Sequence, residues 1–305
     1  MGKIKDIKTR AVINKMSAEG FLLYLPAIII IVGIVIYPMI FAFQMSFTNF
    51  RPTVRTVSNV GFANYITILQ DSGFWRAIYR SLIFTAGCLI PQIIFGLMMA
   101  HLLNHPMLKF KMIFRGLAIT PWLIPTVAVA MIFRFLFNDI YGIINHVLIS
   151  LRFIDRPYPW MAREHTAMFI LILANIWRGT PLMLTMYLAA LQGIPSDMYE
   201  AARVDGANAW KQFWKITLPL LMPVVMVSGI LRFIWTFNFY DLPWVMTGGG
   251  PGEATRTTPI YAYVRAFSGY RFGEGSAITI LLFIILIFFT LIYFFIRQKQ
   301  EKMYK

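Results

Sequence analysis

Residues 200–206 read Glu-Ala-Ala-Arg-Val-Asp-Gly, and after nine further residues the chain continues Ile-Thr-Leu-Pro over 216–219. The stretches on either side, 166–191 and 218–245, are strongly apolar and long enough to cross a membrane. A polar segment between two such stretches stays outside the lipid core, because the core offers its polar groups no partners. The sequence therefore predicts a docking surface at this connection.

The first part of this connection has the signals of a short helix. Ser196 suits the N-cap, and Asp197 and Glu200 fall in the first turn, where the helix dipole favours negative charge. Asp205 and Gly206 then end the helix, because glycine adopts the left-handed conformation after a helix without strain.

A second short helix is expected after Gly206. Trp210, Phe213 and Trp214 fall on one apolar face, while Lys211 and Lys215 share the opposite side. Two short amphipathic helices at a fixed angle would present a knob to a partner.

The composition places the rest of the chain in a bilayer. Of 305 residues 58% are hydrophobic, and the mean hydropathy is +0.65. Beta-barrel alternation is absent, so the apolar stretches are helices. We expect an all-α membrane protein with six membrane-spanning helices, over 21–43, 81–103, 116–137, 166–191, 218–245 and 276–296.

The lysines predict the orientation, because basic residues gather on the cytoplasmic side. Both termini and the 195–219 connection are then cytoplasmic. The domain organisation is a cytoplasmic segment over 1–20, a six-span domain over 21–297 and a tail over 298–305. The lysines are Lys3, Lys5, Lys8, Lys15, Lys109, Lys111, Lys211, Lys215, Lys299, Lys302 and Lys305.

The chain has no sequence signature of an enzyme. It contains no phosphate-binding loop, so it does not cradle ATP in the usual way and its energy comes from elsewhere. Cys88 is the only cysteine, and His101 and His105 share a helix face without a carboxylate nearby. A transporter driven by an ion gradient is the alternative, and it needs buried carboxylates, for which Asp241 is the candidate.

Three of the spans carry polar residues and helix breakers, which line a cavity or a helix contact when they lie within a membrane. They are the 121–126 segment, the 175–182 segment and the residues from Trp235 to Asp241. Aromatic rings suit the C–H faces of a sugar and amides suit its hydroxyls, although the same groups also join helices.

The arginines of these spans leave alternatives open. Arg178 either recognises a carboxylate or phosphate, or pairs with a partner helix or a C-terminal carbonyl. Arg134 and Arg232 are expected to reach a span end or a carboxylate, for which Asp139 and Asp241 are the candidates.

The polar connection resembles the cytoplasmic coupling loop of the membrane subunits of ABC importers. In that family the loop sits in a cleft of the ATP-binding subunit and carries its movement to the membrane helices. The resemblance implies these coupling residues: Glu200, Ala201, Ala202, Asp205, Gly206, Ile216, Leu218 and Pro219.

Three further motifs, at 61–65, 175–181 and 247–251, extend the resemblance over most of residues 20–297. The chain is similar to the first membrane subunit of carbohydrate ABC importers of the maltose/maltodextrin type. The resemblance implies the type I ABC importer permease fold in a prokaryotic inner membrane and sugar transport by alternating access. It also implies a second permease subunit, two ATP-binding subunits that hold ATP and Mg, and an extracytoplasmic solute-binding protein, with no cofactor in this chain.

The same resemblance implies which side chains hold the sugar. The chain departs from the family pattern at Trp122, Arg178 and Trp235. An importer of glycerol phosphate or acidic oligosaccharides is therefore the alternative within this class. The implied substrate residues are Trp122, Thr126, Asn175, Arg178, Gly179, Leu182, Trp235, Asn238 and Phe239.

Overall fold

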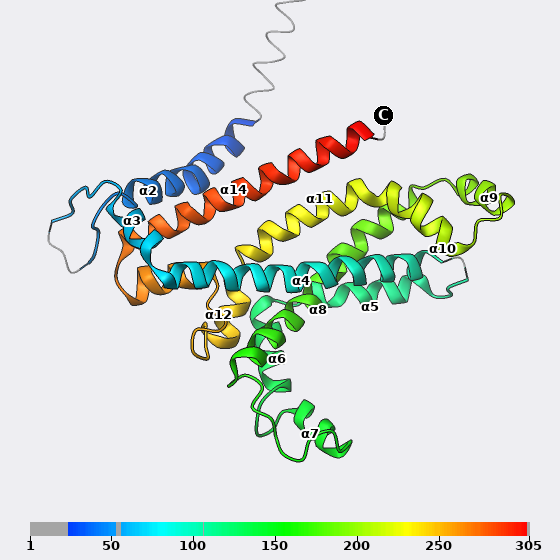
Figure 1. The fold of residues 1–305 in the computed structure, drawn as a ribbon, viewed down its shortest axis with the longest axis horizontal. Helices are drawn as coiled ribbons and strands as arrows, with labels where there is room; N and C mark the ends of the chain where they lie inside the picture. Colours follow the sequence, from blue (N-terminus) through cyan, green and yellow to red (C-terminus); the bar gives the residue numbers. More distant parts are fainter. Residues whose placement is uncertain (1–23, 53–55, 106, 304–305) are drawn as a thin grey trace, which may run out of the picture. The chain divides into compact units, whose positions relative to one another are not determined.

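The computed structural model describes residues 24–52, 56–105 and 107–303, and these residues contain helices and no strand. They form two compact units, shown together as a ribbon in Figure 1. The first unit is 1–68 with 265–280, and the second is 69–264 with 281–305. The predicted cytoplasmic segment 1–20, with Lys3, Lys5, Lys8 and Lys15, lies outside the described residues, as does Lys305.

Five helices are long and apolar enough to cross a membrane. They bear out five of the six predicted spans in number and approximate place. Two of these helices contain a π-helical turn, so each of the two comprises more than one of the helical elements named in this article. The helices are Tyr24–Met45, α4 (Ser72–Asn104), α8 (Glu164–Gln192), Ala209–Phe237 and Phe272–Phe295, the last within α14 (Phe272–Met303).

The third predicted span is broken rather than straight. It consists of α5 (Lys111–Leu123) and α6 (Thr126–Leu136), which meet at an angle of 93°. Pro125 has no N–H and forces Ile124 into an extended conformation, with φ −73° and ψ 130°. Counting this bent pair as one span gives the six that the sequence predicts.

The fifth predicted span, 218–245, is too long. α11 (Leu218–Phe237) ends at Phe237, and Asn238 is its C-cap. A separate helix, α12 (Asp241–Thr247), then begins with an acidic residue in its first turn, as the helix dipole favours.

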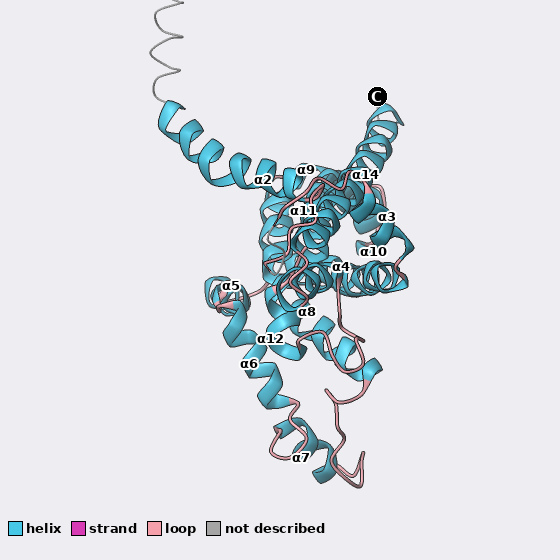
Figure 2. Cartoon of the chain, turned by 90° about the vertical axis from the view of Figure 1, so that its left-hand side faces the viewer, coloured by secondary structure: helices cyan, strands magenta, loops and turns pink. Residues whose placement is uncertain are grey.

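The core of the second unit is built from α4, α8 and α11. α4 packs along α8, and α11 packs on both, as Figure 1 and the turned view of Figure 2 show. Gly96 lets α4 and α8 approach closely, because a Cβ there would lie 2.6 Å from the Cβ of Met183. α5 packs against α8, α12 against α6 and α8, and α13 (Thr258–Tyr263) against α4.

Two apolar cores follow one another along these helices. The residues between them on α4 and α8 include the polar side chains of Gln92 and Asn175, both fully buried. One core is Phe84, Cys88, Val129, Ala130, Phe133, Phe137, Met168, Ile170, Leu171, Ala174, Leu242 and Met246. The other is Ala100, Leu103, Met183, Leu184, Tyr187, Leu188, Leu191 and Leu221.

The loop between α6 and α8 contains α7 (Ile143–Ser150), which is fixed by one buried amide. Asn145 donates to the backbone oxygen of Tyr158 over 3.0 Å and accepts from the indole N–H of Trp160 over 2.7 Å. This loop therefore has a defined structure although it lies outside the predicted spans.

The first unit contains η1 (Val32–Ile36), α2 (Tyr37–Met45) and most of α3 (Ala63–Gln70). The 61–65 motif explains how α2 and α3 are joined. Gly61 has φ +55°, which favours glycine, and the side-chain amide of Asn64 donates to the backbone oxygens of Ser46 and Thr48. The hydroxyls of Ser46 and Tyr65 lie 2.6 Å apart.

A buried carboxylate holds the other part of the first unit. The turn after η3 (Val264–Ser268) leads into α14, where Glu274 accepts from Arg265 over 2.6 Å and from Arg51 over 3.3 Å. Arg271 lies 3.6 Å from the same carboxylate. Three guanidinium groups thus surround one carboxylate.

Candidate functional site

The polar connection between α8 and α11 starts with α9 (Ser196–Val204). Pro195 is its N-cap, and the Ser196 hydroxyl donates to the carboxylate of Asp197 instead of capping the backbone. The predicted N-cap role of Ser196 is therefore wrong by one position. The predicted end is confirmed: Asp205 is the C-cap, and Gly206 has φ +74°.

The second helix of the connection is not a separate short helix. α10 (Ala209–Gln212) begins after Asn208, whose side chain accepts from the amide of Lys211 over 2.9 Å. It then continues through the π-helical turn η2 (Phe213–Thr217) into α11.

Proline does not interrupt this helix. The amide of Leu218 donates to the backbone oxygen of Phe213, five residues back, and this wider turn accommodates Pro219 near the start of α11. A force applied to α10 therefore acts directly on α11, because no flexible joint separates them.

Three hydrogen bonds fix the angle between the two arms of the connection. The hydroxyls of Tyr199 and Thr217 lie 2.9 Å apart, and the side chain of Gln212 donates to the backbone oxygen of Ala207 over 2.8 Å. The amide of Ala207 donates to the backbone oxygen of Ala202 over 2.8 Å. We call residues 196–219 the elbow. Its shape is set within the chain.

The outer surface of the elbow is open. Val204 is 89% exposed and Trp210 is 71% exposed, while Glu200 and Asp205 are also exposed. Trp210 packs edge-on against Trp214, and Phe213 turns inward to the ring of His101 on α4. The predicted apolar face is thus divided between an anchor to α4 and an exposed indole. Among the remaining predicted coupling residues Ala201 and Gly206 are exposed, and Ala202, Ile216, Leu218 and Pro219 are half-buried.

Deep in the second unit, Arg232 of α11 joins Gln92 of α4 and Asn175 of α8. Its Nε donates to Gln92 Oε1 over 2.7 Å, and its Nη2 donates to Asn175 Oδ1 over 3.0 Å. The Gln92 amide in turn donates to the backbone oxygen of Asn175 over 2.7 Å. Gly179 makes room for this polar cluster, because a Cβ there would lie 2.1 Å from Arg232 Nη2.

This polar cluster corrects one sequence prediction, because Arg232 reaches neither a span end nor a carboxylate. Arg134 lies exposed in the last turn of α6, at a span end as predicted, and donates to the backbone oxygen of Val245 over 3.3 Å. Sequence reasoning also missed Gln92. The signal was present, because a long amide inside an apolar span calls for a polar partner on another helix. Two predicted substrate residues, Asn175 and Gly179, are buried at this cluster.

Arg178 and Phe239, both predicted substrate residues, lie together. The guanidinium carbon of Arg178 is 5.7 Å from the ring centroid of Phe239, within the range of a cation–π contact. Arg178 Nε is buried without a hydrogen-bond partner among the described residues. Of the two interpretations of Arg178, the contact with other helices has support here.

The other predicted substrate residues are accessible in this chain. Trp122 is 44% exposed at the end of α5, and Trp235 is 53% exposed on α11. Asn238 is exposed, whereas Thr126 and Leu182 are half-buried. The assignment of these residues to a substrate stays a prediction.

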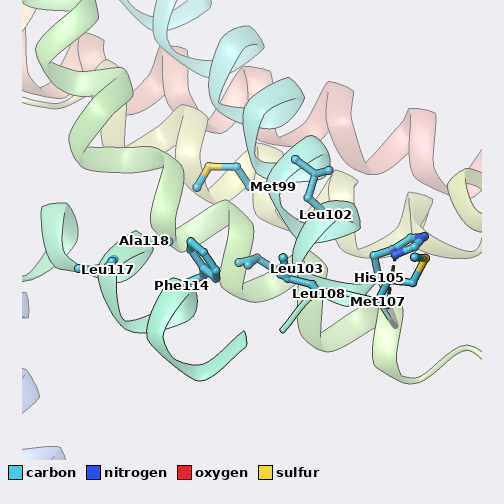
Figure 3. A pocket seen from close by; sticks show the side chains of 9 residues that line it. All are labelled: Met99, Leu102, Leu103, His105, Met107, Leu108, Phe114, Leu117 and Ala118. Atoms are coloured by element: carbon cyan, nitrogen blue, oxygen red, sulfur yellow. Dashed lines mark hydrogen bonds between the residues drawn. The ribbon is translucent and has the colours of Figure 1, made fainter. Parts of the chain in front are cut away.

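Two of the hollows in the second unit are lined by described residues of α4, α5 and α8. One, of about 330 Å³, lies where Pro121 of α5 meets Trp177 and Thr180 of α8, so parts of the third and fourth spans share a wall. The other, of about 680 Å³, lies between the end of α4 and α5, and Figure 3 shows His105 at one end of its apolar lining. Such a lining offers a sugar few hydrogen-bond partners.

The family of this chain follows from comparison with known proteins. The family model of the binding-protein-dependent transport system inner membrane component matches residues 92–303. The chain belongs to this family. It is therefore a multi-pass inner membrane component of an ABC transporter.

Relatives of known description align over nearly the whole chain. The trehalose/maltose transport system permease protein MalF of Thermococcus litoralis is 35% identical, covering 90% of this chain and 92% of that protein. The sulfoquinovosyl glycerol transport system permease protein SmoG of Agrobacterium fabrum is 34% identical, covering 92% of this chain and 90% of that protein. The arabinooligosaccharides transport system permease protein AraP of Bacillus subtilis is also 34% identical, covering 90% and 87%.

A solved structure has the same fold. A subunit of a bacterial ABC transporter involved in the import of the acidic polysaccharide alginate superimposes with a TM-score of 0.81 at 23% identity, covering 97% of this chain and 98% of that one. The predicted type I ABC importer permease fold is confirmed. The predicted location of both termini in the cytoplasm stays a prediction.

Proposed function

We propose that this permease moves a sugar or oligosaccharide into the cell, powered by ATP hydrolysis on two partner subunits. The observation that carries the proposal is the elbow, whose shape is fixed internally and whose outer surface is open. α11 is continuous with the second arm, and only the three residues 193–195 separate α8 from the first arm, so a push on the elbow reaches both membrane helices through a short connection.

The partners in this proposal are supported by the family of this chain and by its relatives. A single permease subunit does not enclose a path between two halves, so a second, related permease completes it. A solute-binding protein delivers the sugar outside, and a solved relative of the same fold is described in complex with a substrate-bound periplasmic protein. ATP and Mg are held by the two ATP-binding subunits.

Three relatives of 34–35% identity are named for the transport of saccharides or a glycosyl glycerol, which supports a sugar as the substrate. An acidic sugar is the second candidate, because Arg178 has a buried Nε without a partner. The guanidinium of Arg178 already contacts the ring of Phe239, and two of these relatives are named for trehalose/maltose and for arabinooligosaccharides, so a neutral sugar is the first candidate. An ion-driven mechanism has less support, since the candidate carboxylate of Asp241 is exposed.

The test uses the whole importer in vesicles, with its companion permease, ATP-binding subunits and binding protein. Uptake of maltose, trehalose and an arabino-oligosaccharide is compared with uptake of a uronic-acid oligosaccharide, with and without ATP. We expect uptake of a neutral sugar that needs both ATP and the binding protein. Uptake that follows a membrane potential without ATP contradicts the proposal.

The elbow is tested separately through Gly206, which has φ +74° and open space around it. Gly206→Val strains the backbone without a clash, so we expect sugar uptake to fall while ATP hydrolysis persists. Gly116→Ala is the matched control, because a Cβ there also meets nothing within 4 Å and its φ is not in the left-handed region. Normal uptake by the Gly206→Val importer would count against coupling through the elbow.

A further inference from the structure

The hydrogen bonds of the polar cluster fix which way both of its amides point. An arginine side chain only donates, so Gln92 Oε1 and Asn175 Oδ1 must face the guanidinium of Arg232. The NH₂ group of Gln92 is then free to donate to the backbone oxygen of Asn175. The three bonds form one closed network across α4, α8 and α11.

This network tolerates little sliding of one helix against another. A shift of α11 by one residue is about 1.5 Å along its axis, which takes bonds of 2.7 and 3.0 Å out of hydrogen-bonding range. Arg232 is 6% exposed and has no carboxylate within salt-bridge distance among the described residues. Losing these bonds leaves a buried charge without partners, which is costly in a membrane interior.

The position of the network relates it to the elbow. α8 leads into the elbow and α11 leads out of it. Above the elbow the Ser228 hydroxyl donates to the Tyr187 hydroxyl over 3.1 Å, and further along Asn175 and Arg232 link the same two helices again. At 1.5 Å per residue the Asn175–Arg232 link lies roughly 25 Å from the end of α8 and roughly 20 Å along α11 from the elbow. Two helices tied at separate points along their length move as one body.

We propose that Gln92 and Arg232 are positioning residues for transport. They hold α4, α8 and α11 as one block, so that a displacement of the elbow moves α8 and α11 together and does not spread them apart. The inference rests on the proposed function in one respect: the elbow is displaced by ATP-binding subunits.

The test measures the separation of α8 and α11 during the ATP cycle. Spin labels are placed at the exposed positions Thr185 of α8 and Leu220 of α11, and Cys88 stays in place because it is fully buried. Dipolar broadening is recorded on the assembled importer in vesicles, without nucleotide and after trapping with ATP and vanadate.

We expect the spectra of the parent without nucleotide and after trapping to coincide, because α4, α8 and α11 move as one rigid block. In the Gln92→Leu/Arg232→Met variant we expect trapping to change the dipolar broadening, because α8 and α11 separate. Arg232→Lys is the second variant, since an ammonium keeps the charge but not the two-pronged geometry, and we expect an intermediate change. It also keeps the test open if the double variant does not assemble.

The control removes a different buried polar contact on α4. Ser81 and Thr258 are fully buried with hydroxyls 2.9 Å apart, and they join α4 to α13 but not α8 to α11. Ser81→Ala/Thr258→Val should give spectra that coincide, as in the parent.

Two outcomes overturn the inference. In the first, α8 and α11 of the parent separate on trapping. In the second, the spectra of the variants do not change on trapping. Neither outcome touches the proposed function, which is tested by ATP-dependent sugar uptake in the same vesicles. A parent importer without that uptake refutes the proposed function instead.

Discussion

Gly179→Ala tests the polar cluster most directly, because it adds a methyl group where the backbone of Gly179 packs against the side chains of Arg232 and Gln92. The new Cβ would lie 2.1 Å from Arg232 Nη2 and 2.4 Å from Gln92 Nε2. Ordinary contact needs about 3.5 Å, so the guanidinium has to move by more than about 1 Å. That movement breaks the bonds of 2.7 and 3.0 Å that Arg232 makes.

The size of the effect follows from these bonds. Each hydrogen bond to a charged group contributes about 1.5–3 kcal/mol, so losing both costs roughly 3–6 kcal/mol of folding free energy. This is a large part of the ~5–15 kcal/mol that stabilises a typical protein. We therefore expect Gly179→Ala to lower the melting temperature of the detergent-solubilised importer clearly, measured by loss of the monodisperse elution peak after heating.

A double-mutant cycle separates this cause from a general intolerance of alanine. Arg232→Ala destabilises by itself because it leaves Gln92 and Asn175 without their partner. Adding Gly179→Ala to that variant should cost less than it costs the parent, because the clash with the guanidinium is gone and only Gln92 Nε2, the end of a side chain that has lost its arginine partner, has to move. Melting temperatures that fall additively in the double variant, or a Gly179→Ala importer as stable as its parent, would refute the reasoning.

Three further outcomes follow from the contacts of single side chains. Asn208→Ala removes the N-cap of α10, so we expect a loss of about 1 kcal/mol locally, seen as faster amide hydrogen exchange over 209–212. Trp210→Ala removes an exposed indole from the elbow, and it should weaken copurification of the ATP-binding subunits while leaving the permease pair assembled. Glu274→Gln leaves Arg51, Arg265 and Arg271 without their shared carboxylate, so we expect a lower melting temperature that high salt partly restores.

The sequence predicts most of the fold, because each long apolar stretch has one solution in lipid. A chain without water around it must form its hydrogen bonds within the segment, and this alone fixes helices near the predicted spans. The breaks are harder to predict. Pro125 turns the chain by 93°, whereas Pro219 is absorbed into a continuous helix by a wider turn. Both residues are prolines, so the contacts around each one decide whether the helix breaks or continues.

The candidate site is less predictable than the fold, because polar residues in a membrane serve two purposes that look alike in sequence. Asn175 has the composition and spacing of a substrate residue, yet its amide is fully buried against Arg232. Arg232 carried no signal of its partners, since Gln92 and Asn175 lie on different helices far along the chain. The elbow was easier, because its helix signals are local: Gly206 ends α9 as its sequence position indicates.

The place of the polar cluster between two apolar cores has a physical reason. Lipid is as apolar as leucine, so apolar contacts hold membrane helices together without strongly favouring one register over the next. Register in the second unit must come from directional contacts and from close approach. Gly96 and Gly179 supply the close approach, and the hydrogen bonds of Arg232 supply the direction. Hydrogen bonds near the middle of α8 oppose sliding of the helices in both apolar cores at once, whereas hydrogen bonds at one end of α8 would act on one core only.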